Sequence, residues 1–504
     1  MEALDWLVIG VFFLALIGII VWVVRQKQND SADYFLGGRD ATWLAIGASI
    51  FASNIGSEHL IGLAGAGASS GMAMAHWEIQ GWMILILGWV FVPFYTRSMV
   101  YTMPEFLERR YNPQSRTILS VISLVSYVLT KVAVTVYAGG LVFQQVFGIK
   151  ELWGIDFFWI AAIGLVVLTA LYTIFGGMKS VLYTSVLQTP ILLLGSLIIL
   201  VLGFKELGGW DEMMRVCGAV TVNDYGDTMT NLIRSNDDAN FPWLGALIGS
   251  AIIGFWYWCT DQFIVQRVLS GKNEMEARRG TIFGAYLKLL PVFLFLIPGM
   301  IAFALHQKYI GAGGEGFLPM LENGTANADA AFPTLVAKLL PAGVKGLVVC
   351  GILAALMSSL ASLFNSSAML FTIDFYKRFR PQTSEKKLVG IGQVATVVIV
   401  ILGILWIPIM RSVGDVLYTY LQDVQSVLAP GIAAAFLLGI CWKRTSAQGG
   451  MWGLISGMVI GLTRLGAKVY YSNAGEVADS TFKYLFYDMN WLFFCGWMFL
   501  FCII

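Results

Sequence analysis

Apolar runs of about twenty residues recur along the whole chain, and they limit its fold more than any other feature. The first of them, from Trp6 to Val24, contains no charged residue. Only 12% of the 504 residues are charged and 58% are hydrophobic, whereas soluble domains carry about a quarter charged residues. A hydrocarbon core of roughly 30 Å needs about 20 apolar residues per helix, and barrel strands would alternate over about ten. The chain is therefore predicted to be an all-α integral membrane protein.

We expect about thirteen membrane spans. The apolar runs place them at Trp6–Val24, Trp43–Ala66, Trp77–Phe94, Ile118–Val146, Phe157–Phe175, Ser180–Leu202, Leu244–Phe263, Ile282–Leu305, Val344–Leu370, Val389–Met410, Val416–Leu438, Met451–Tyr470 and Tyr487–Ile504. The two long polar segments, Phe204–Pro242 and His306–Val344, are expected outside the membrane. The chain stops at "FLFCII", inside an apolar run, which leaves a truncated chain or a further span as open alternatives.

Positive charges set the predicted orientation, because Lys and Arg of short loops collect on the cytoplasmic side. Alternate loops carry Arg25 and Lys27; Arg97, Arg109, Arg110 and Arg116; Lys179; Arg267, Lys272, Arg278 and Arg279; Lys377, Arg378, Arg380, Lys386 and Lys387; and Lys443 and Arg444. We therefore expect a multi-pass protein of the plasma membrane with its N-terminus outside the cell. The lipid bilayer is one partner, and a net charge of +1 argues against nucleic acid as another.

A small set of polar side chains falls at membrane depth. A charge there costs about 2.5 to 3.5 kcal/mol and normally faces a cavity, a partner or a pathway. The set comprises Glu58, His59, Glu78, Lys288, Asn54, Gln188, Asn365 and Gln422. Taken singly, each is explained equally well as an interhelical hydrogen bond or as a residue near the interface.

The second span contains "FASNIGSEHLIG", which predicts a broken helix. Asn54, Gly56 and Ser57 are poor helix formers, and Glu58 and His59 follow them directly. A break of this kind exposes backbone carbonyls that bind a cation and a substrate near the membrane midplane. A packing face of small residues is the alternative, but it does not explain Asn54, Glu58 and His59 together.

The ninth span contains "LMSSLASLFNSS", with Ser358 and Ser359 adjacent and Ser362 one turn further on. Hydroxyls beside exposed carbonyls form a neutral oxygen site, which suits a hard monovalent cation better than a divalent one. Without a partner span, a serine-rich packing face remains the better explanation.

The seventh span reads "GFWYWCTDQFIVQR", with Trp256, Tyr257 and Trp258 in a row. Aromatic faces beside amide and charged groups suit a polyhydroxylated ring, which needs stacking on its C–H face and hydrogen bonds around its rim. An aromatic belt at the membrane interface is the alternative. No nucleotide-binding loop of the Walker type occurs, so the sequence favours secondary transport over ATP-driven pumping.

Several long motifs resemble those of the sodium:solute symporter family, in its sodium/glucose cotransporter branch. They are "DYFLGGRDATWLAIGASIFASNIGSEHLIGLAGAGASSGMAMAHWE", "WYWCTDQFIVQR", "YLKLLPVFLFLIPGM", "LMSSLASLFNSS" with "FTIDFY", and "FLLGICWKR". The resemblance covers about Tyr34 to Arg464 and implies the leucine-transporter fold with two inverted five-helix repeats. The implied division is a leading helix and inner loop at 1–39, repeats at 40–203 and 242–440, outer segments at 204–241 and 306–344, and additional helices at 441–504.

The resemblance also implies which residues bind the ligands. The sugar site corresponds to Asn54, His59, Glu78, Tyr257, Lys288 and Gln422, with Trp258 as a neighbour. The outer gate corresponds to Leu63, Trp77 and Tyr418, and Tyr257 corresponds to the inner gate. The co-transported sodium ion corresponds to carbonyls of Ala52, Ile55 and Ala355 and hydroxyls of Ser358 and Ser359.

Three positions depart from the family pattern. Ser185 stands where the family usually has an aspartate, and Ala361 stands where members with a second sodium site carry a hydroxyl. These two departures favour one sodium per sugar. Gly254 stands where relatives offer the sugar a polar side chain, so the choice of hexose stays open.

The predicted function is inward sodium symport of a hexose such as glucose or galactose by alternating access. We expect Glu78 and Lys288 to compensate each other's charge, and Glu58 to be a structural partner. Symport of myo-inositol is the first alternative, and a monocarboxylate or an amino acid is a more distant one. A sodium- or sugar-gated channel or sensor of the same fold is a third. An enzyme is not expected, and the oligomeric state stays open.

Overall fold

The computed structural model describes residues 1–26, 30–56, 58–321, 324–413, 417–473 and 479–504, without the side chains of residues 129, 409–413, 417–423 and 472–473. Its helices are α1 (Ala3–Val24), α2 (Ser31–Leu36), α3 (Trp43–Asn54), α4 (Ala64–Ser70), α5 (Ala75–Ile79), α6 (Met83–Ile86), α7 (Val92–Ser98), α8 (Met103–Arg110), α9 (Pro113–Ser126), α10 (Ala133–Phe147), α11 (Phe157–Leu207), α12 (Trp210–Gly218), α13 (Trp243–Gly254), α14 (Gln262–Leu269), α15 (Glu274–Leu287), α16 (Ile297–Gly311), α17 (Ala331–Leu339), α18 (Val344–Met369), α19 (Lys377–Phe379), α20 (Glu385–Val413), α21 (Leu417–Cys441), α22 (Ala447–Asn473), α23 (Thr481–Lys483) and α24 (Trp491–Ile503). Strands β1 (Glu151–Leu152) and β2 (Ile155–Asp156) form a small antiparallel hairpin.

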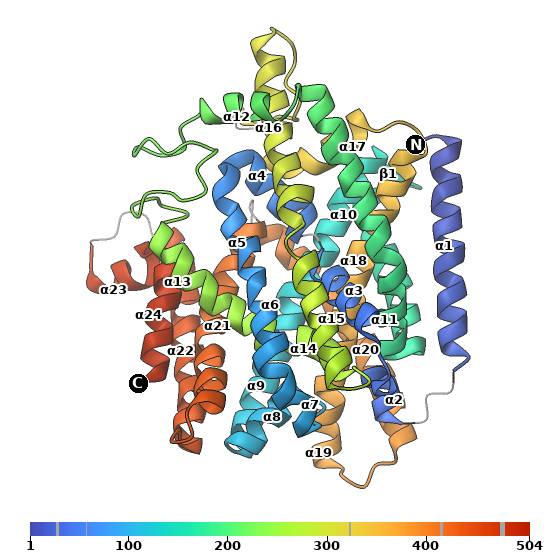
Figure 1. Cartoon of the computed structure of the whole chain (residues 1–504), viewed down its shortest axis with the longest axis vertical. Coiled ribbons are helices and arrows are strands. Elements are labelled where there is room, and N and C mark those ends of the chain that lie inside the picture. The colour runs from blue at the N-terminus through green and yellow to red at the C-terminus, as the bar shows by residue number, and fades with distance from the viewer. Residues whose placement is uncertain (27–29, 57, 322–323, 414–416, 474–478) are drawn as a thin grey trace.

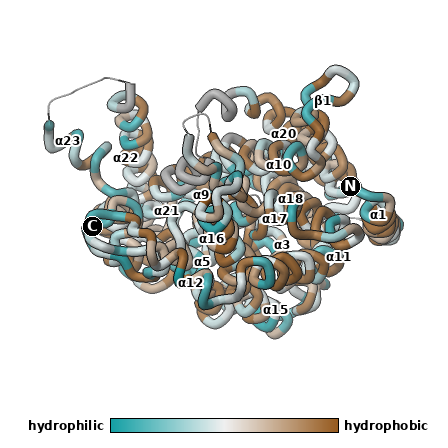
Figure 2. Tube along the Cα trace, turned by 90° about the horizontal axis from the view of Figure 1, so that it is seen from above, coloured by the Kyte–Doolittle hydropathy of each residue, from teal (hydrophilic) through white to brown (hydrophobic). Residues whose placement is uncertain are grey.

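The long helices run roughly side by side between two polar ends, with α1 at one edge of the bundle and α22 and α24 at the other (Figure 1). Of the most apolar stretch of α18, 94% is buried, against 22% of that of α1. Hydrophobic residues occur along outer as well as inner helices (Figure 2), and large apolar side chains such as Leu14, Leu247 and Leu405 are exposed. A lipid-facing surface around a buried central helix explains this pattern.

Nine helices of the described residues are long and apolar enough to cross a membrane, or ten if the bent pair at residues 481–488 and 491–503 counts as one span. This number is smaller than the predicted thirteen because several predicted spans are counted together or fall outside this count. The predicted spans Phe157–Phe175 and Ser180–Leu202 both lie within α11, on either side of a break at Gly177 (φ 53°, ψ −149°). The second predicted span is divided between the short α3 and a segment continuous with the third, and α22 is not among the nine.

Two helices are interrupted inside the bundle. Helix α3 ends at Asn54, where Ile55 adopts an extended conformation (φ −79°, ψ 101°), and a π-helical turn follows at Glu58–Leu63. Helix α13 continues through a π-helical turn at Phe255–Thr260 and stops at the extended Asp261, whose side chain caps α14. The predicted break in the second span is therefore confirmed, and the seventh span has a break as well.

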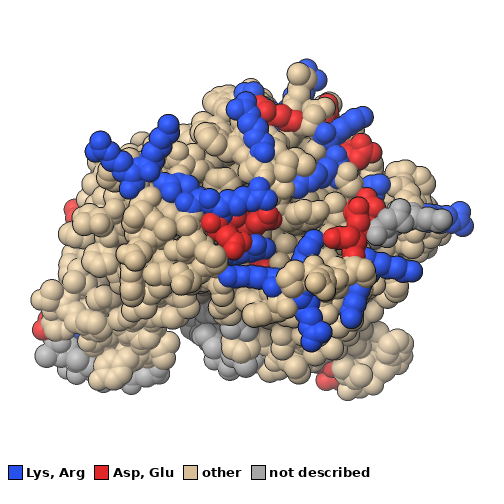
Figure 3. Space-filling model, turned by 90° about the horizontal axis from the view of Figure 1, so that it is seen from below, with Lys and Arg blue, Asp and Glu red and all other residues tan. Residues whose placement is uncertain are grey.

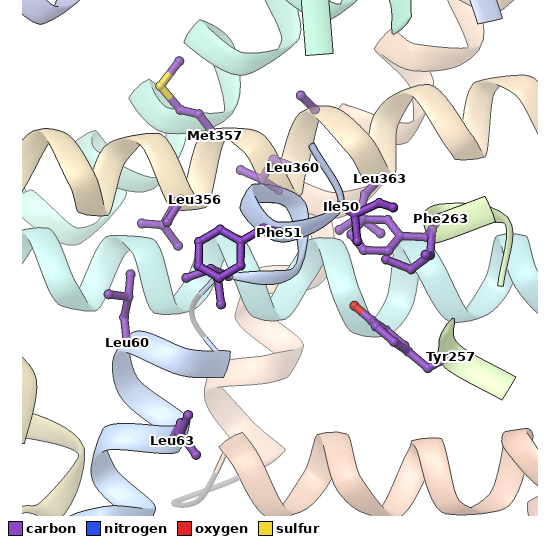
Figure 4. Close-up of a cluster of buried hydrophobic side chains, with 14 of the residues drawn as sticks. Ile50, Phe51, Leu60, Leu63, Tyr257, Phe263, Leu356, Met357, Leu360 and Leu363 are labelled. Carbon is purple, nitrogen blue, oxygen red and sulfur yellow. The ribbon is translucent and has the colours of Figure 1, made fainter. Parts of the chain in front are cut away.

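Glycines bring the first interrupted helix close to α15. A Cβ atom at Gly47 would lie 2.7 Å from the carbonyl oxygen of Gly280, and one at Gly280 would lie 2.6 Å from Cβ of Ile46. Apolar side chains of α3, of the turn that follows it and of α18 meet beside Tyr257 (Figure 4). This packing fixes the break of α3 against α15 on one side and α18 on the other.

The two ends of the bundle differ in charge. The lower end, at α8 and α19, presents a face on which Lys and Arg side chains gather (Figure 3). The N-terminus and α12 lie at the opposite end (Figure 1). Not every predicted loop charge is on the surface, because Arg267 lies within α14 with 1% of its surface exposed. For Arg267 the expectation of a cytoplasmic loop was wrong.

Candidate functional site

A cavity of about 30 Å³ lies beside the break of α3. Its lining comes from six parts of the chain and consists of Asn54, Glu58, His59, Trp77, Glu78, Gln80, Ile253, Tyr257, Trp258, Lys288 and Gln425. The volume equals about one water's share of the liquid, so a larger ligand needs the surrounding helices or side chains to move apart. Six of the seven residues predicted for the sugar are in this lining. The seventh, Gln422, and the predicted gate residue Tyr418 lie outside the described side chains.

Three buried groups form a charged cluster on one wall. Lys288 Nζ lies 2.6 Å from Glu78 Oε2 and 2.7 Å from His59 Nε2. His59 Nε2 lies 3.2 Å from Glu78 Oε1. The predicted compensation of Glu78 by Lys288 is confirmed, as a buried pair at membrane depth requires. Gly81 makes the approach possible, because a Cβ atom there would lie 2.6 Å from Cγ of Lys288.

A hydrogen bond connects the two interrupted helices across the cavity. Asn54 Nδ2 at the end of α3 donates to Tyr257 Oη at 2.9 Å. The ring of Tyr257 packs edge-on against Trp258, with 4.9 Å between centroids. Tyr257 points from its turn toward the apolar cluster around α3 (Figure 4). Both breaks therefore contribute to the same wall, and this hydrogen bond joins them.

Several polar atoms of the wall have no hydrogen-bond partner among the described residues. They are Asn54 Oδ1, His59 Nδ1 and Gln80 Oε1, on side chains that are all buried. His59 Nδ1 can donate or accept a hydrogen bond, depending on the tautomer of the ring. An unsatisfied buried polar group costs about 1 to 3 kcal/mol. The cavity thus offers both donors and acceptors to a ligand with several hydroxyl groups.

A second group of oxygens lies on the other side of the α3 break. Ser359 Oγ donates to the carbonyl oxygens of Ser53 at 2.7 Å and Ile55 at 3.4 Å. Ser358 Oγ lies 3.3 Å from Ser185 Oγ. A Cβ atom at residue 56 would approach Ser359 Oγ to 2.9 Å, so Gly56 is needed there. The structure brings together two of the five predicted sodium ligands, Ile55 and Ser359, whereas the hydroxyl of the predicted ligand Ser358 contacts Ser185.

The other two predicted ligands, Ala52 and Ala355, are buried on the same helices, α3 and α18. The donor set consists of neutral hydroxyl and carbonyl oxygens, which fits a monovalent cation. Among the described residues there is no group of three or more His, Cys, Asp or Glu side chains that could hold a metal.

Comparisons with known proteins agree with this geometry. The sequence profile of the sodium:solute symporter family matches residues 34–457. The chain belongs to the sodium:solute symporter family. As predicted, it is a sodium-coupled solute symporter and not an enzyme.

The symporter is similar to two groups of curated relatives. It is 38% identical to sodium/myo-inositol cotransporter 2 of Homo sapiens over 479 residues, which cover 92% of the chain and 70% of the relative. It is also 38% identical to sodium/glucose cotransporter 2 of Rattus norvegicus over 514 residues, which cover 97% and 75% of the two chains.

Solved structures show the same fold. A sodium-coupled sialic acid symporter in a substrate-bound outward-open state superposes with a TM-score of 0.79 at 22% identity, over 100% of this chain and 96% of the other. MhsT in complex with L-phenylalanine superposes with a TM-score of 0.54 at 12% identity, over 94% and 99%. The predicted leucine-transporter fold is thereby confirmed.

A fixed positive charge lies next to the serine cluster, which consists of Ser49, Ser53, Ser185, Ser358 and Ser359. Arg267 Nε donates to Ser53 Oγ at 2.9 Å and to Ser49 Oγ at 3.2 Å. Its Nη1 and Nη2 atoms have no hydrogen-bond partner among the described residues. Ser185 Oγ in turn donates to Ser49 Oγ at 3.4 Å. Among the described residues, no carboxylate forms a hydrogen bond or ion pair with Arg267 or with these serines.

A buried ion pair supports Tyr257 from behind. Lys131 Nζ lies 2.6 Å from Asp261 Oδ2 and 4.7 Å from the centroid of the Tyr257 ring. Tyr127 Oη also donates to Asp261. The sequence reasoning missed both charges, although each falls inside a predicted span, where any charge is a signal.

The predicted gate residues that can be described lie near the cavity. Trp77 lines it and packs edge-on against Trp491 with 5.7 Å between centroids. Leu63 is buried in the apolar cluster at the end of the turn that follows α3 (Figure 4).

The cavity wall also contains Glu58 and two amides. Glu58 lines the cavity, and its charge acts on the buried Lys131 and Lys288, so its expected role as a structural partner stays a prediction. Gln80 and Gln425 line the same cavity and were not predicted. Their signal was present, since Gln80 follows Glu78 by two residues and Gln425 follows Gln422 by three.

Proposed function

We propose that this symporter couples inward sodium movement to the uptake of a polyhydroxylated six-membered ring, in the first place a hexose such as glucose or galactose. The observation that carries the proposal is the wall of the cavity. It combines free donors and acceptors on Asn54, His59 and Gln80 with the aromatic rings of Tyr257 and Trp258. Rim hydrogen bonds and a flat apolar face are what a ring of hydroxyls needs.

The charges of the wall argue against an acidic substrate. Glu58 and Glu78 provide two carboxylates, and Lys288 is already paired with Glu78. A monocarboxylate would need a cation that is not compensated by the protein. Glucose, galactose and myo-inositol are neutral and need no uncompensated cation in the site.

Symport of myo-inositol is the second candidate. Relatives named as sodium/myo-inositol cotransporters match this chain at 38 to 39% identity, as closely as those named for glucose. Glucose has a ring oxygen and a hydroxymethyl group where myo-inositol has a hydroxyl-bearing ring carbon and a hydroxyl, so hydrogen-bonding positions at this edge of the ring can decide between them.

For the co-transported ion, the proposed ligands are the carbonyls of Ala52, Ile55 and Ala355 and the hydroxyls of Ser358 and Ser359. The contacts of Ser359 with the end of α3 support this assignment. Ser185 supplies no carboxylate and Ala361 supplies no hydroxyl for a second cation, which supports one sodium per substrate. Sodium would fix the shape of the α3 break, and the neighbouring Asn54 would then be placed for the substrate.

The energetics allow concentrative uptake. One charge moving through 100 mV gains about 2.3 kcal/mol. A tenfold sodium gradient adds about 1.4 kcal/mol, and the sum corresponds to an accumulation of roughly several hundred-fold.

The same proposal includes the repeats and the orientation. We assign residues 40–203 and 242–440 to the two repeats, so that α3 and α13 with α14 are the equivalent interrupted helices. The Lys- and Arg-rich face opposite the N-terminus supports a plasma-membrane protein with its N-terminus outside (Figure 3). Trp77, Leu63 and Tyr418 are proposed for the outer gate and Tyr257 for the inner gate.

Uptake into proteoliposomes tests the function. Labelled glucose, galactose, myo-inositol and lactate are offered with an inward sodium gradient, with a potassium gradient and with sodium on both sides. We expect accumulation above equilibrium of a neutral ring under the sodium gradient alone. Equal uptake under all conditions would indicate a channel, and accumulation of lactate alone would contradict the proposal. Substrate binding without uptake would indicate a sensor.

A further inference from the structure

Gln80 reaches across the cavity to a position on α13 where the chain has no side chain. A Cβ atom at Gly254 would lie 2.6 Å from Gln80 Oε1 and 3.4 Å from its Cβ atom. Atoms this close overlap, so a side chain at residue 254 and the observed position of Gln80 exclude each other. Because Gly254 has no side chain, the amide of Gln80 can occupy the space beside it.

The backbone gives no other reason for a glycine at this position. Gly254 has ordinary helical angles (φ −62°, ψ −40°) that any residue adopts. A glycine inside a helix is destabilising by roughly 0.5 to 1 kcal/mol relative to alanine. Its function at residue 254 is therefore steric, and the group it makes room for is the amide of Gln80.

The amide of Gln80 has no hydrogen-bond partner in the part of the chain that the structure describes. The side chain is buried and lines the cavity, and Oε1 is unsatisfied by the described residues. No hydrogen bond of its Nε2 atom to another described residue occurs either. A glutamine retained for helix packing would satisfy these atoms with backbone groups. An amide carries one acceptor and two donors, so it can bond two neighbouring hydroxyls of one ring.

We propose that Gln80 is a specificity-determining contact of the transported ring, and that Gly254 allows it to reach the ring. This inference rests on the proposed function and adds a residue to it. Gln80 recognises one hydroxyl-bearing edge of the substrate, apart from the group contacted by the Glu78, His59 and Lys288 cluster. Discrimination between epimers that differ at this edge depends on Gln80.

Four variants test the pair: Gln80→Ala, Gly254→Ala, the double variant and Gln188→Ala. Gln188 is the matched control, since it is a buried glutamine without bonded amide atoms that does not line the cavity. Sodium-driven uptake is measured for the best neutral ring and for each of its monodeoxy analogues, normalised to the amount of protein in the vesicles.

For Gln80→Ala we expect KM for the parent ring to rise roughly tenfold, as for one lost hydrogen bond. One or two monodeoxy analogues should show almost no change, because they lack the partner of Gln80. Gly254→Ala should shift the same analogues by displacing the amide. The double variant should be no worse than Gln80→Ala, since coupled residues are not additive. Gln188→Ala should leave the discrimination pattern as in the wild type.

Three results would overturn the inference. One is a Gln80→Ala symporter with wild-type KM values for the whole panel. Another is an equal loss for the parent ring and every analogue, with additive effects in the double variant, because this is the behaviour of a packing residue. The third is a wild-type protein that accumulates no member of the panel, which also defeats the proposed function. The first two leave the proposed function intact.

Discussion

The break of α3 separates two regions that are built in opposite ways. On one side, the cavity is walled by long side chains from six parts of the chain, including the buried pair of Glu78 and Lys288. On the other side, the hydroxyl of Ser359 on α18 bonds directly to the backbone carbonyls of Ser53 and Ile55. The cavity has free polar atoms and little volume, whereas the serine cluster is compact. The region proposed for the cation is thus closely packed, and the region proposed for the substrate must open to accept a ring.

The largest effect is expected from Lys288→Ala, which leaves Glu78 as an uncompensated buried charge. Breaking a buried pair costs about 3 to 5 kcal/mol, so substrate uptake should fall by roughly a hundredfold or more. The double variant Glu78→Gln/Lys288→Met removes both charges and should recover the amount of folded protein in the membrane without recovering uptake. Wild-type uptake kinetics in Lys288→Ala would remove the pair from the substrate region.

Ser359→Ala should act on the cation region. Losing one interaction with an ion is worth about 1.5 kcal/mol or more, so the half-saturating sodium concentration should rise roughly tenfold. The KM for substrate at saturating sodium should change little, because the cavity wall is untouched. Ser367→Ala is the matched control, since Ser367 is buried on α18 and its hydroxyl has no hydrogen-bond partner among the described residues. An unchanged sodium dependence in Ser359→Ala alone would place the cation elsewhere.

Ser185→Asp is expected to strengthen sodium binding, whereas Ser359→Ala is expected to weaken it. It introduces a carboxylate close to Ser358 and near the guanidinium of Arg267, which lies beside the serine cluster. We expect the half-saturating sodium concentration to fall several-fold, because a like charge next to the cation is then compensated. Ser185→Asn is the neutral control. A rise in the sodium requirement of the aspartate variant would mean that Arg267 does not oppose the bound cation.

The smallest effect concerns the outer segment at residues 204–241, which belongs neither to the cavity nor to the serine cluster. Asp238 is buried there, which alone would raise its pKa. Hydrogen bonds from the backbone N–H groups of Phe241 and Asn240 and from Asn223, together with nearby Arg234, lower it overall. Because its pKa is lowered on folding, Asp238 stabilises the folded segment at any pH above the ordinary aspartate pKa of about 3.9. This stabilisation is lost as the pH falls from that value through the lowered pKa of the folded state.

Limited proteolysis of the outer segment should therefore be independent of pH between about 5 and 8 and should increase only below about pH 4. In Asp238→Asn the segment should be cleaved faster at neutral pH as well. Cleavage that changes between pH 5 and 8 in the wild type would assign the dependence to another group.

Part of this organisation could be predicted from the sequence because it rests on local chemistry. Asn54 and Gly56 disfavour a continuous helix wherever they occur, and the break of α3 follows from them. Glu78 and Lys288 had to be compensated at membrane depth, and their contact follows from that cost. The adjacent hydroxyls of Ser358 and Ser359 gained meaning only when α3 was placed against α18.

What could not be predicted depends on geometry between distant segments. Arg267 looks like a loop charge at the end of an apolar run, and only the break before α14 turns it toward the serine cluster. Gln80 acquires a role because Gly254, far away in sequence, leaves space for it. The number of long apolar helices is lower than the number of predicted spans partly because α11 contains two of these spans, divided by the break at Gly177.

The central claim is that the cation and the ring are coupled through one break, and equilibrium binding tests it most directly. The affinity of the purified symporter for a labelled ring is measured over a series of sodium concentrations, and its affinity for sodium over a series of ring concentrations. Linkage requires the two to change by the same factor. We predict a factor of roughly ten or more, abolished in Ser359→Ala. Ring affinity that is independent of sodium would contradict the claim.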